Sequence, residues 1–359
     1  MDAAGLRAAF SVFDRYAYLN AGTCGPVPQA AVDAVREVLA GAAANGRGAG
    51  YYEALGARRA ALRSSYAELL GAHADDVALT TSTSEGVVRV LGALELAPGD
   101  EVLTSDEEHP GLQGPLAAAR ARRGIALRAV PFAQIAAEVR PETRLIACSH
   151  VSWISGRVVG DLSDVADVPV LLDGAQGVGA VPTDPTALGC SFYAGSGQKW
   201  LCGPVGSGML WTSPRWRDRL PAIGPTYLNL AEPAAGLAAV PRADAARLDA
   251  SAQSLETITA ADAAIGVLRD AGWTAVHERA AALACDLAAA LAAAGRDVMP
   301  RSDTTLISWK DADPAATRAR LAAAGVLIRD LPGTGLLRAS VGAWNDETDL
   351  DRLLSALTA

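Results

Sequence analysis

Seven short apolar segments between residues 75 and 213, interleaved with helix-like segments, limit the folds open to this chain. The segments at 143–152 and 168–176 are apolar at nearly every position of their strand-like part, which is typical of parallel strands covered on both faces. Strands that alternate with helices predict a layered α/β fold with a mostly parallel sheet. The expected strands are 75–82, 100–107, 125–132, 143–152, 168–176, 190–196 and 206–213.

The expected helices indicate two domains. In the first part of the chain they lie at 28–44, 56–71, 84–94, 111–124 and 133–139. Beyond about residue 256 the pattern changes to alanine-rich helices, short strands and two more helices, which predicts a smaller α+β domain. The helices there are expected at 260–272 and 273–295, and the strands at 304–310, 325–330 and 335–342.

A chain of 359 residues is long enough for such an arrangement. We expect an N-terminal segment 1–27 near the site, a large domain 28–250 and a small C-terminal domain 251–359. Residues 223–250, rich in Pro, Gly and Ala, are the expected connector.

Composition excludes several classes of function. The formal net charge is −9, with acids and bases interspersed, which argues against nucleic acid and gives no support for an anionic membrane surface. We find no apolar stretch long enough to span a bilayer and no signal pattern, so we expect a cytoplasmic protein. The five cysteines form no CxxC pair, and the four histidines are scattered, so we expect no metal site. Cys148 and Cys190 are expected to be buried as small hydrophobes.

Polar clusters follow five of the expected strands. Because ligands of open α/β sheets bind beyond the carboxyl ends of the strands, these clusters are expected to line one crevice. They are residues 82–86, 107–111, 150–156, 173–176 and 196–199.

Lys199 and Asp173 are the most informative members of these clusters. A lysine in an apolar cleft is costly unless it is paired or neutralised, and covalent use of the amine as a Schiff base is one reason to keep it there. Taken alone, a structural or solvent-facing lysine is the commoner case. Asp173 ends an apolar strand, where it can pair with a pyridinium nitrogen or simply cap the following helix.

The remaining clusters supply donors and a ring. Ser82, Thr83 and Ser84 begin a helix, which suits a phosphate, although a plain N-cap is the alternative. His109 either stacks on a ring, acts on protons or is an ordinary loop histidine. Gln176 and Ser196 are hydrogen-bonding side chains. Together the clusters supply what one cofactor needs: an amine for an aldehyde, a carboxylate for a ring nitrogen, and donors for a phosphate.

At this point the sequence resembles the class V aminotransferase family of fold-type I pyridoxal-phosphate (PLP) enzymes, which includes the cysteine desulfurases. The resemblance covers about residues 18–355. It implies a large domain with a mostly parallel seven-stranded sheet and a smaller C-terminal α+β domain. The motifs that carry it are TSTSEGV, EEHPG, SHVSWISG, LLDGAQGVGAVPTD, GSGQKWLCGPVGSG and LLRASVGAWN.

The resemblance implies roles for individual residues. Lys199 would be the Schiff-base lysine, Asp173 would pair with the pyridinium, Gln176 would bond the phenolic oxygen and His109 would stack on the ring. The phosphate would be held by Thr83, Ser84, Ser196 and Gln198, with Ser251 reaching a neighbouring subunit. Arg338 would bind the α-carboxylate of the substrate. The other expected substrate-binding residues are Trp153, Asn20 and Ala21.

Departures from the family pattern bear on the reaction. Cysteine desulfurases carry a persulfide-forming cysteine before the arginine segment, whereas residues 325–340 here contain none. Trp153 stands where those enzymes usually have Asn, and Gln198 replaces a common histidine. The motifs look most like the cysteine/cystine C–S lyase branch, which also resembles isopenicillin N epimerase-like proteins.

The implied reaction is β-elimination from cysteine, cystine or a cysteine S-conjugate, giving a thiol or persulfide, pyruvate and ammonia. Transamination, epimerisation or decarboxylative oxidative deamination of a cysteine S-conjugate would use the same residues, and a non-catalytic PLP-binding protein is a further alternative. The resemblance also implies a homodimer with its site at the subunit boundary.

Overall fold

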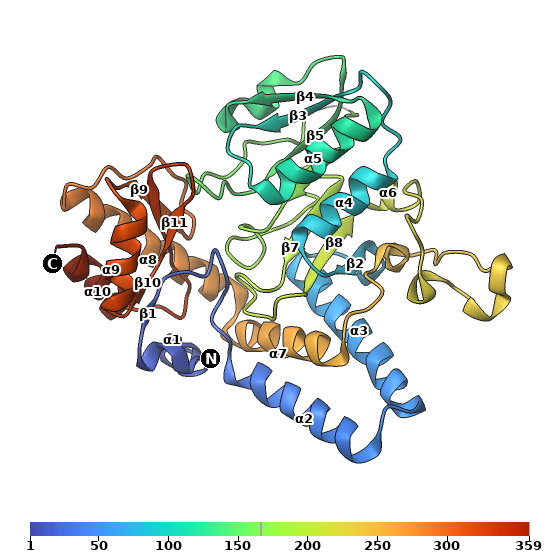
Figure 1. The fold of residues 1–359 in the computed structure, drawn as a ribbon, viewed down its shortest axis with the longest axis horizontal. Coiled ribbons are helices and arrows are strands. Elements are labelled where there is room, and N and C mark those ends of the chain that lie inside the picture. The colour runs from blue at the N-terminus through green and yellow to red at the C-terminus, as the bar shows by residue number, and fades with distance from the viewer. Residues whose placement is uncertain (166, 359) are drawn as a thin grey trace.

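The computed structural model describes residues 1–165 and 167–358, and its centre is a seven-stranded sheet (Figure 1). The strand order is β2-β8-β7-β6-β5-β3-β4, and all neighbours are parallel except β8, which is antiparallel to β2 and β7. The expected fold class is therefore confirmed. The strands are β2 Val77–Thr80, β3 Glu101–Ser105, β4 Ala126–Val130, β5 Thr143–Ser149, β6 Val170–Asp173, β7 Phe192–Ser196 and β8 Gly208–Thr212.

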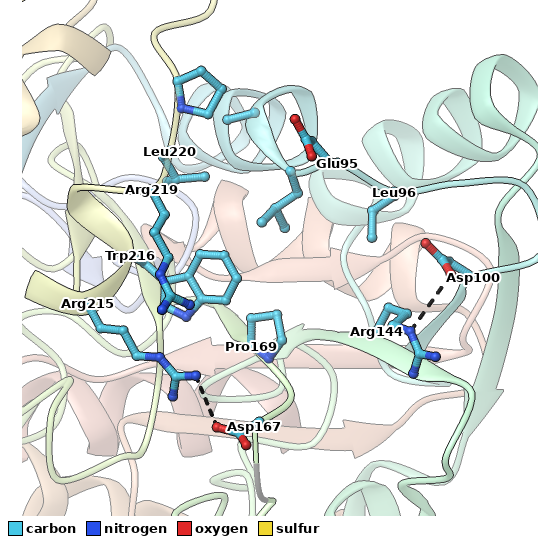
Figure 2. A pocket seen from close by; sticks show the side chains of 13 residues that line it. Glu95, Leu96, Asp100, Arg144, Asp167, Pro169, Arg215, Trp216, Arg219 and Leu220 are labelled. Atoms are coloured by element: carbon cyan, nitrogen blue, oxygen red, sulfur yellow. Dashed lines mark hydrogen bonds and ion pairs between the residues drawn. The ribbon is translucent and has the colours of Figure 1, made fainter.

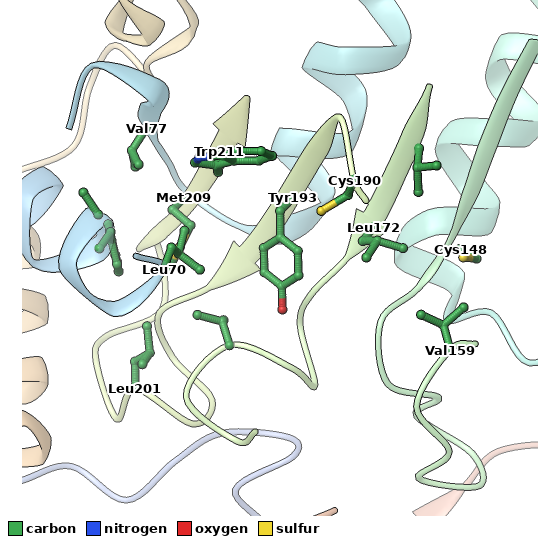
Figure 3. Close-up of a cluster of buried hydrophobic side chains, with 14 of the residues drawn as sticks. Leu70, Val77, Cys148, Val159, Leu172, Cys190, Tyr193, Leu201, Met209 and Trp211 are labelled. Atoms are coloured by element: carbon green, nitrogen blue, oxygen red, sulfur yellow. The ribbon is translucent and has the colours of Figure 1, made fainter. Parts of the chain in front are cut away.

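Both faces of this sheet are buried, which explains the continuous apolar runs. On one face Leu172, Tyr193 and Met209 join a core that also holds Cys148 and Cys190, as Figure 3 shows. On the other face the intervening residues of the same strands pack against α4 Thr83–Ala93 and α5 Pro110–Arg123. The expectation that both cysteines are buried is confirmed.

Long helices flank the first of these cores. These are α3 Ala49–Leu69 and α7 Leu255–Ala271, which pack on each other, and α2 Gln29–Asn45 packs in turn on α7 (Figure 1). The α3 helix begins at Ala49, seven residues before the predicted start. Its buried residues all lie from Arg59 onward, so its first turns carry no apolar periodicity that sequence reasoning could detect. The predicted helix at 133–139 is a 3₁₀ helix, Phe132–Glu138.

The C-terminal part contains a three-stranded antiparallel sheet in the order β11-β12-β9. The predicted strand at 325–330 divides into two, because the chain changes partner after Leu327: β10 pairs with β1 and β11 pairs with β12. The strands are β1 Ala17–Tyr18, β9 Leu306–Lys310, β10 Val326–Leu327, β11 Arg329–Leu331 and β12 Leu336–Ser340. The helices around them are α1 Ala3–Ala8, α8 Trp273–Ala293, α9 Pro314–Ala323 and α10 Glu347–Thr358, while α6 Pro214–Arg217 follows β8.

The N-terminal segment therefore joins the C-terminal strands. Beyond the β1–β10 pair, Asn20 forms a parallel bridge with Ser340 at the end of β12. This brings residues 20–25 to the carboxyl-end edge of the large sheet, where Gly25 donates its N–H to the carbonyl of Gln198. Where the domains divide remains a prediction.

Candidate active site

Lys199 lies in the turn between β7 and β8, at the edge to which the carboxyl ends of the parallel strands point. Burial lowers the pKa of its amine to about 8, and the positive charges of Arg338 and Arg329 act in the same direction, while Asp173 opposes them. Within the described residues no ion pair to Lys199 is formed. A lowered pKa increases the fraction of neutral amine, and the neutral amine is the form that attacks an aldehyde carbon.

Asp173 ends β6 and is buried, with one Oδ1 accepting the N–H of Ala175 at 2.9 Å. Burial raises the pKa of its carboxyl, and the charge of Lys199 partly offsets this. A carboxylate at this place fits a protonated ring nitrogen, which would supply the positive partner that the side chain lacks.

His109 is the N-cap of α5, where its Nδ1 accepts the N–H of Gly111 at 3.0 Å. The ring is neutral over a wide pH range, because burial and the nearby charge of Lys199 lower its pKa to about 4. Its edge meets the Trp153 ring, with 4.9 Å between ring centres and an angle of 86°. A neutral, partly buried imidazole is suited to stacking on a planar ligand ring.

Glu107 and Glu108 anchor the loop that carries His109. Glu108 is buried and accepts from both the N–H and the hydroxyl of Ser149, at 3.1 and 2.6 Å. Burial raises the pKa of Glu108 to about 7. Glu107 accepts from Ser155 at 2.5 Å. Sequence reasoning assigned these two acids no role, although they stand in the same motif as the histidine.

Two of the residues expected at the phosphate meet at the start of α4. Thr83 Oγ1 and Ser196 Oγ are 2.9 Å apart and buried, although they lie on α4 and β7. Gln198 has a buried Oε1 with no hydrogen-bond partner among the described residues. Ser84 faces the start of α5, since a Cβ at Gly111 would lie 2.6 Å from its Oγ. Free N–H groups and hydroxyls at a helix N-terminus suit a phosphate.

Ser251 is exposed and makes no contact with this cradle in the single chain. It stands two residues before Gln253, whose side chain donates to the carbonyls of Thr80 and Gly206, at 2.8 and 3.1 Å. Its assignment to a neighbouring subunit remains a prediction.

Arg338, on β12, is a buried cation without a carboxylate. Its Nη1 donates to the carbonyl of Trp153 at 2.8 Å, and its Nε has no partner among the described residues. Burial lowers the pKa of the guanidinium to about 9, and the charge of Arg329 adds to this. A carboxylate ligand would supply both the missing acceptor and the missing charge.

The N-terminal segment closes this part of the site. Ala21 is fully buried, and Asn20 accepts from the hydroxyl of Thr23 at 2.7 Å. A Cβ at Gly22 would lie 2.9 Å from Nη2 of Arg338, so the Gly22 backbone lies directly against the guanidinium. The Gly22 carbonyl accepts from Nε2 of Gln176 at 2.8 Å.

Arg329 was not predicted. It lies on β11 directly opposite Arg338, and its Nη1 donates to Thr23 Oγ1 at 3.3 Å. The signal was present, because an arginine interrupts an apolar strand nine residues before Arg338, but only the antiparallel pairing shows that the two share a site.

A cavity of about 440 Å³ lies at the other edge of the sheet, where β3, β5 and β6 begin (Figure 2). Two of its arginines meet acids, since Arg215 pairs with Asp167 at 3.0 Å and Arg144 approaches Asp100 at 3.9 Å, and the third, Arg219, lies over the Trp216 ring. Ligands of open α/β sheets bind at the opposite edge, so the site around Lys199 is the candidate active site.

The family model for class V aminotransferases matches residues 17–353, and the chain belongs to this family. Enzymes of this family depend on pyridoxal phosphate, and the expectation of such an enzyme is confirmed. Among the described helices, none has the length and apolar character needed to cross a membrane.

Individual relatives are known under several names. A probable cysteine desulfurase of Pseudomonas aeruginosa is 32% identical over 98% of this chain and 96% of its own length. An isopenicillin N epimerase of Streptomyces clavuligerus is 31% identical over 61% of this chain and 58% of its own. Among solved structures, a mutant of C-DES with glycine covalently linked to its PLP cofactor has a TM-score of 0.91 at 25% identity, covering 98% of each chain. A complex of the cystine C–S lyase C-DES with its reaction product cysteine persulfide has a TM-score of 0.89 at 25% identity, covering 95% of this chain and 97% of that one.

Proposed function

We propose that this protein is a PLP-dependent C–S lyase that carries out β-elimination on a cysteine-derived amino acid. The observation that carries the proposal is the buried, carboxylate-free guanidinium of Arg338 in the same crevice as the amine of Lys199. The guanidinium can bind the α-carboxylate of an amino acid, and the amine can remove its α-proton.

The residues fit the cofactor. Asp173 would face the ring nitrogen, His109 the ring and Gln176 the phenolic oxygen, while Thr83, Ser84, Ser196 and Gln198 would hold the phosphate. When bound, PLP supplies an electron sink for the electrons left at the α-carbon. Asp173 would keep that sink effective by holding a proton on the ring nitrogen.

The chain's own residues have separate tasks in the reaction. Arg338 binds and orients the α-carboxylate, and Nζ of Lys199 removes the α-proton once the amine is free. Trp153, only 8% exposed, walls the site with an apolar surface. The β-sulfur then leaves; with cystine and one water, the products are cysteine persulfide, pyruvate and ammonia.

Arg329 narrows the substrate class. A second cation beside Arg338 favours a substrate with a second anionic group, and cystine carries two carboxylates. Arg329→Ala is expected to lower kcat/KM for cystine about tenfold while leaving that for cysteine S-conjugates without a distal acid nearly unchanged. Equal losses for both substrate types would contradict this assignment.

The test of the reaction is product analysis with cystine, cysteine and S-alkyl cysteines. Pyruvate and ammonia in equal amounts are expected. Formation of alanine from cysteine would indicate sulfur transfer to a protein thiol. Formation of a D-amino acid would indicate epimerisation. Formation of a keto acid that still contains the sulfur would indicate transamination. Cys24 is a partly buried free thiol directly before Gly25, whose N–H donates to the carbonyl of Gln198, so Cys24→Ser is the control, and it is expected to keep pyruvate formation. If added amino acids do not change the absorbance spectrum of the PLP-loaded protein, the non-catalytic alternative is supported.

The working form in this proposal is a homodimer in the cytoplasm. The connector extends away from the body of the chain (Figure 1), and Tyr227, Leu237 and Val240 on it are exposed large hydrophobics that a second copy would cover. All five cysteines are free, which is usual in a reducing compartment. Light scattering is expected to give twice the mass of one chain.

A further inference from the structure

The amide of Gln176 is held at both ends by groups that leave it one orientation. Its Oε1 accepts from the indole Nε1 of Trp200 at 3.0 Å, and its Nε2 donates to the carbonyl of Gly22 at 2.8 Å. An indole N–H can only donate and a backbone carbonyl can only accept. Reversing the amide would therefore break both bonds at once.

This orientation decides what Gln176 offers to a ligand. The oxygen end of the amide faces Trp200, and the nitrogen end faces Gly22, where one of its two N–H groups is used. The polar hydrogen that is left is a donor. Trp200 is only 1% exposed and Gln176 only 4%, so water does not readily replace either partner.

The same bonds reach the substrate side of the site. Gly22 lies against the guanidinium of Arg338, since a Cβ there would be 2.9 Å from Nη2. Trp200 also follows Lys199 directly in the chain. The hydrogen bonds of Trp200 and Gly22 to Gln176 thus connect the turn that carries Lys199 with the segment beside Arg338.

We propose that Trp200 is a positioning residue: its indole N–H fixes the amide of Gln176 so that Gln176 presents an N–H, and not an oxygen, to the cofactor's phenolic oxygen, and it ties the segment around Gly22 beside Arg338. The part that concerns the cofactor rests on the proposed function. Trp200 acts through Gln176 and does not itself contact the reacting atoms.

The test replaces Trp200 by Phe, which removes the N–H donor and keeps an aromatic ring. A donor to the phenolic oxygen stabilises the deprotonated chromophore, so its loss raises the pKa of the visible chromophore, by about 0.4 to 1 unit. Trp211→Phe is the matched control, because Trp211 is also buried and its indole N–H has no partner among the described residues. It is expected to leave that pKa unchanged.

Two further measurements isolate the contact. In a Gln176→Ala background, Trp200→Phe is expected to cause no additional shift, because the amide it orients is gone. In cofactor-free protein, amide hydrogen exchange at residues 20–25 is expected to quicken in Trp200→Phe and not in Trp211→Phe.

The outcomes separate this proposal from the proposed function. A Trp200→Phe variant with the chromophore pKa and the exchange rates of Trp211→Phe would overturn the positioning role. A wild-type protein that takes up no PLP would overturn the proposed function and the cofactor part of the role. The exchange measurement needs no cofactor, so it decides the Trp200–Gln176–Gly22 arrangement in either case.

Discussion

Arg338 and Asp249 are both buried charges, yet their surroundings are opposite. Asp249 accepts from Arg59 and Arg63 at 2.7 Å each and from the N–H of Leu79 at 2.8 Å. Arg338 meets no acid within the described residues, and its neighbours Arg329 and Lys199 are positive. The first cluster is complete in charge without a ligand and serves the fold, although Nη1 of Arg59 has no hydrogen-bond partner among the described residues. The second cluster has a positive charge without an acidic partner, and such a charge is suited to binding an anionic ligand.

The largest effect is expected at Lys199, whose amine would form the covalent bond to the cofactor and would also act as the base. Lys199→Ala should abolish turnover and the visible absorbance of the cofactor-loaded protein, because the covalent amine and the base are both lost. Pyruvate release and the absorbance spectrum measure this. Lys310 is the chain's other lysine, and it is exposed and paired with Asp297 at 2.7 Å. Lys310→Ala should therefore behave as the wild type, and full activity in Lys199→Ala would refute the assignment.

Breaking the complete cluster should cost stability. Asp249→Ala leaves the buried Arg59, the partly buried Arg63 and the Leu79 N–H without their acceptor, so the free energy of unfolding is expected to fall by about 3–5 kcal/mol. Denaturant titration measures it. Asp297→Ala removes an exposed acid of an ion pair and is the control, with an expected loss below about 1 kcal/mol. If both variants unfold at the same denaturant concentration, the cluster is not structural.

Removing the charge of Arg338 should lower activity and leave stability intact. Arg338→Met is expected to lower kcat/KM about 10- to 150-fold, since a charge-assisted bond to a carboxylate contributes about 1.5–3 kcal/mol. The free energy of unfolding should not fall, because the variant buries no unpaired cation. Steady-state kinetics and denaturant titration together test this. A large loss of stability with unchanged kinetics would make Arg338 a structural residue.

The smallest expected effect is a shift along the pH axis. A neutral amine is needed to capture PLP, and an amine is neutral above its pKa. With the pKa of Lys199 near 8, the rate of PLP uptake by cofactor-free protein should rise with pH and be half-maximal near pH 8. Because the Arg338 charge lowers that pKa, Arg338→Met should move the midpoint to higher pH. Stopped-flow absorbance records the profile, and a midpoint that stays put would show that the two charges do not interact.

Much of the site was accessible from the sequence because it sits on local signals. Thr83, His109, Asp173 and Lys199 each follow a strand or begin a helix, and a parallel sheet brings the ends of its strands to one edge. The fold class followed from the same pattern. Trp200 and Gln176 were also in quoted motifs, but their hydrogen bond depends on how the turn after β7 folds back.

The sequence by itself therefore determined the layered sheet and the residue types at the carboxyl ends of its strands, since hydrophobic periodicity and the alternation of strands and helices are local properties of the chain. The tertiary structure alone decided that Arg329 stands opposite Arg338, that Gly22 lies against that guanidinium, and that Asp249 is satisfied by two arginines. These contacts join residues far apart in the chain. Whether a buried charge is paired depends on which segments meet, and no local pattern carries that information.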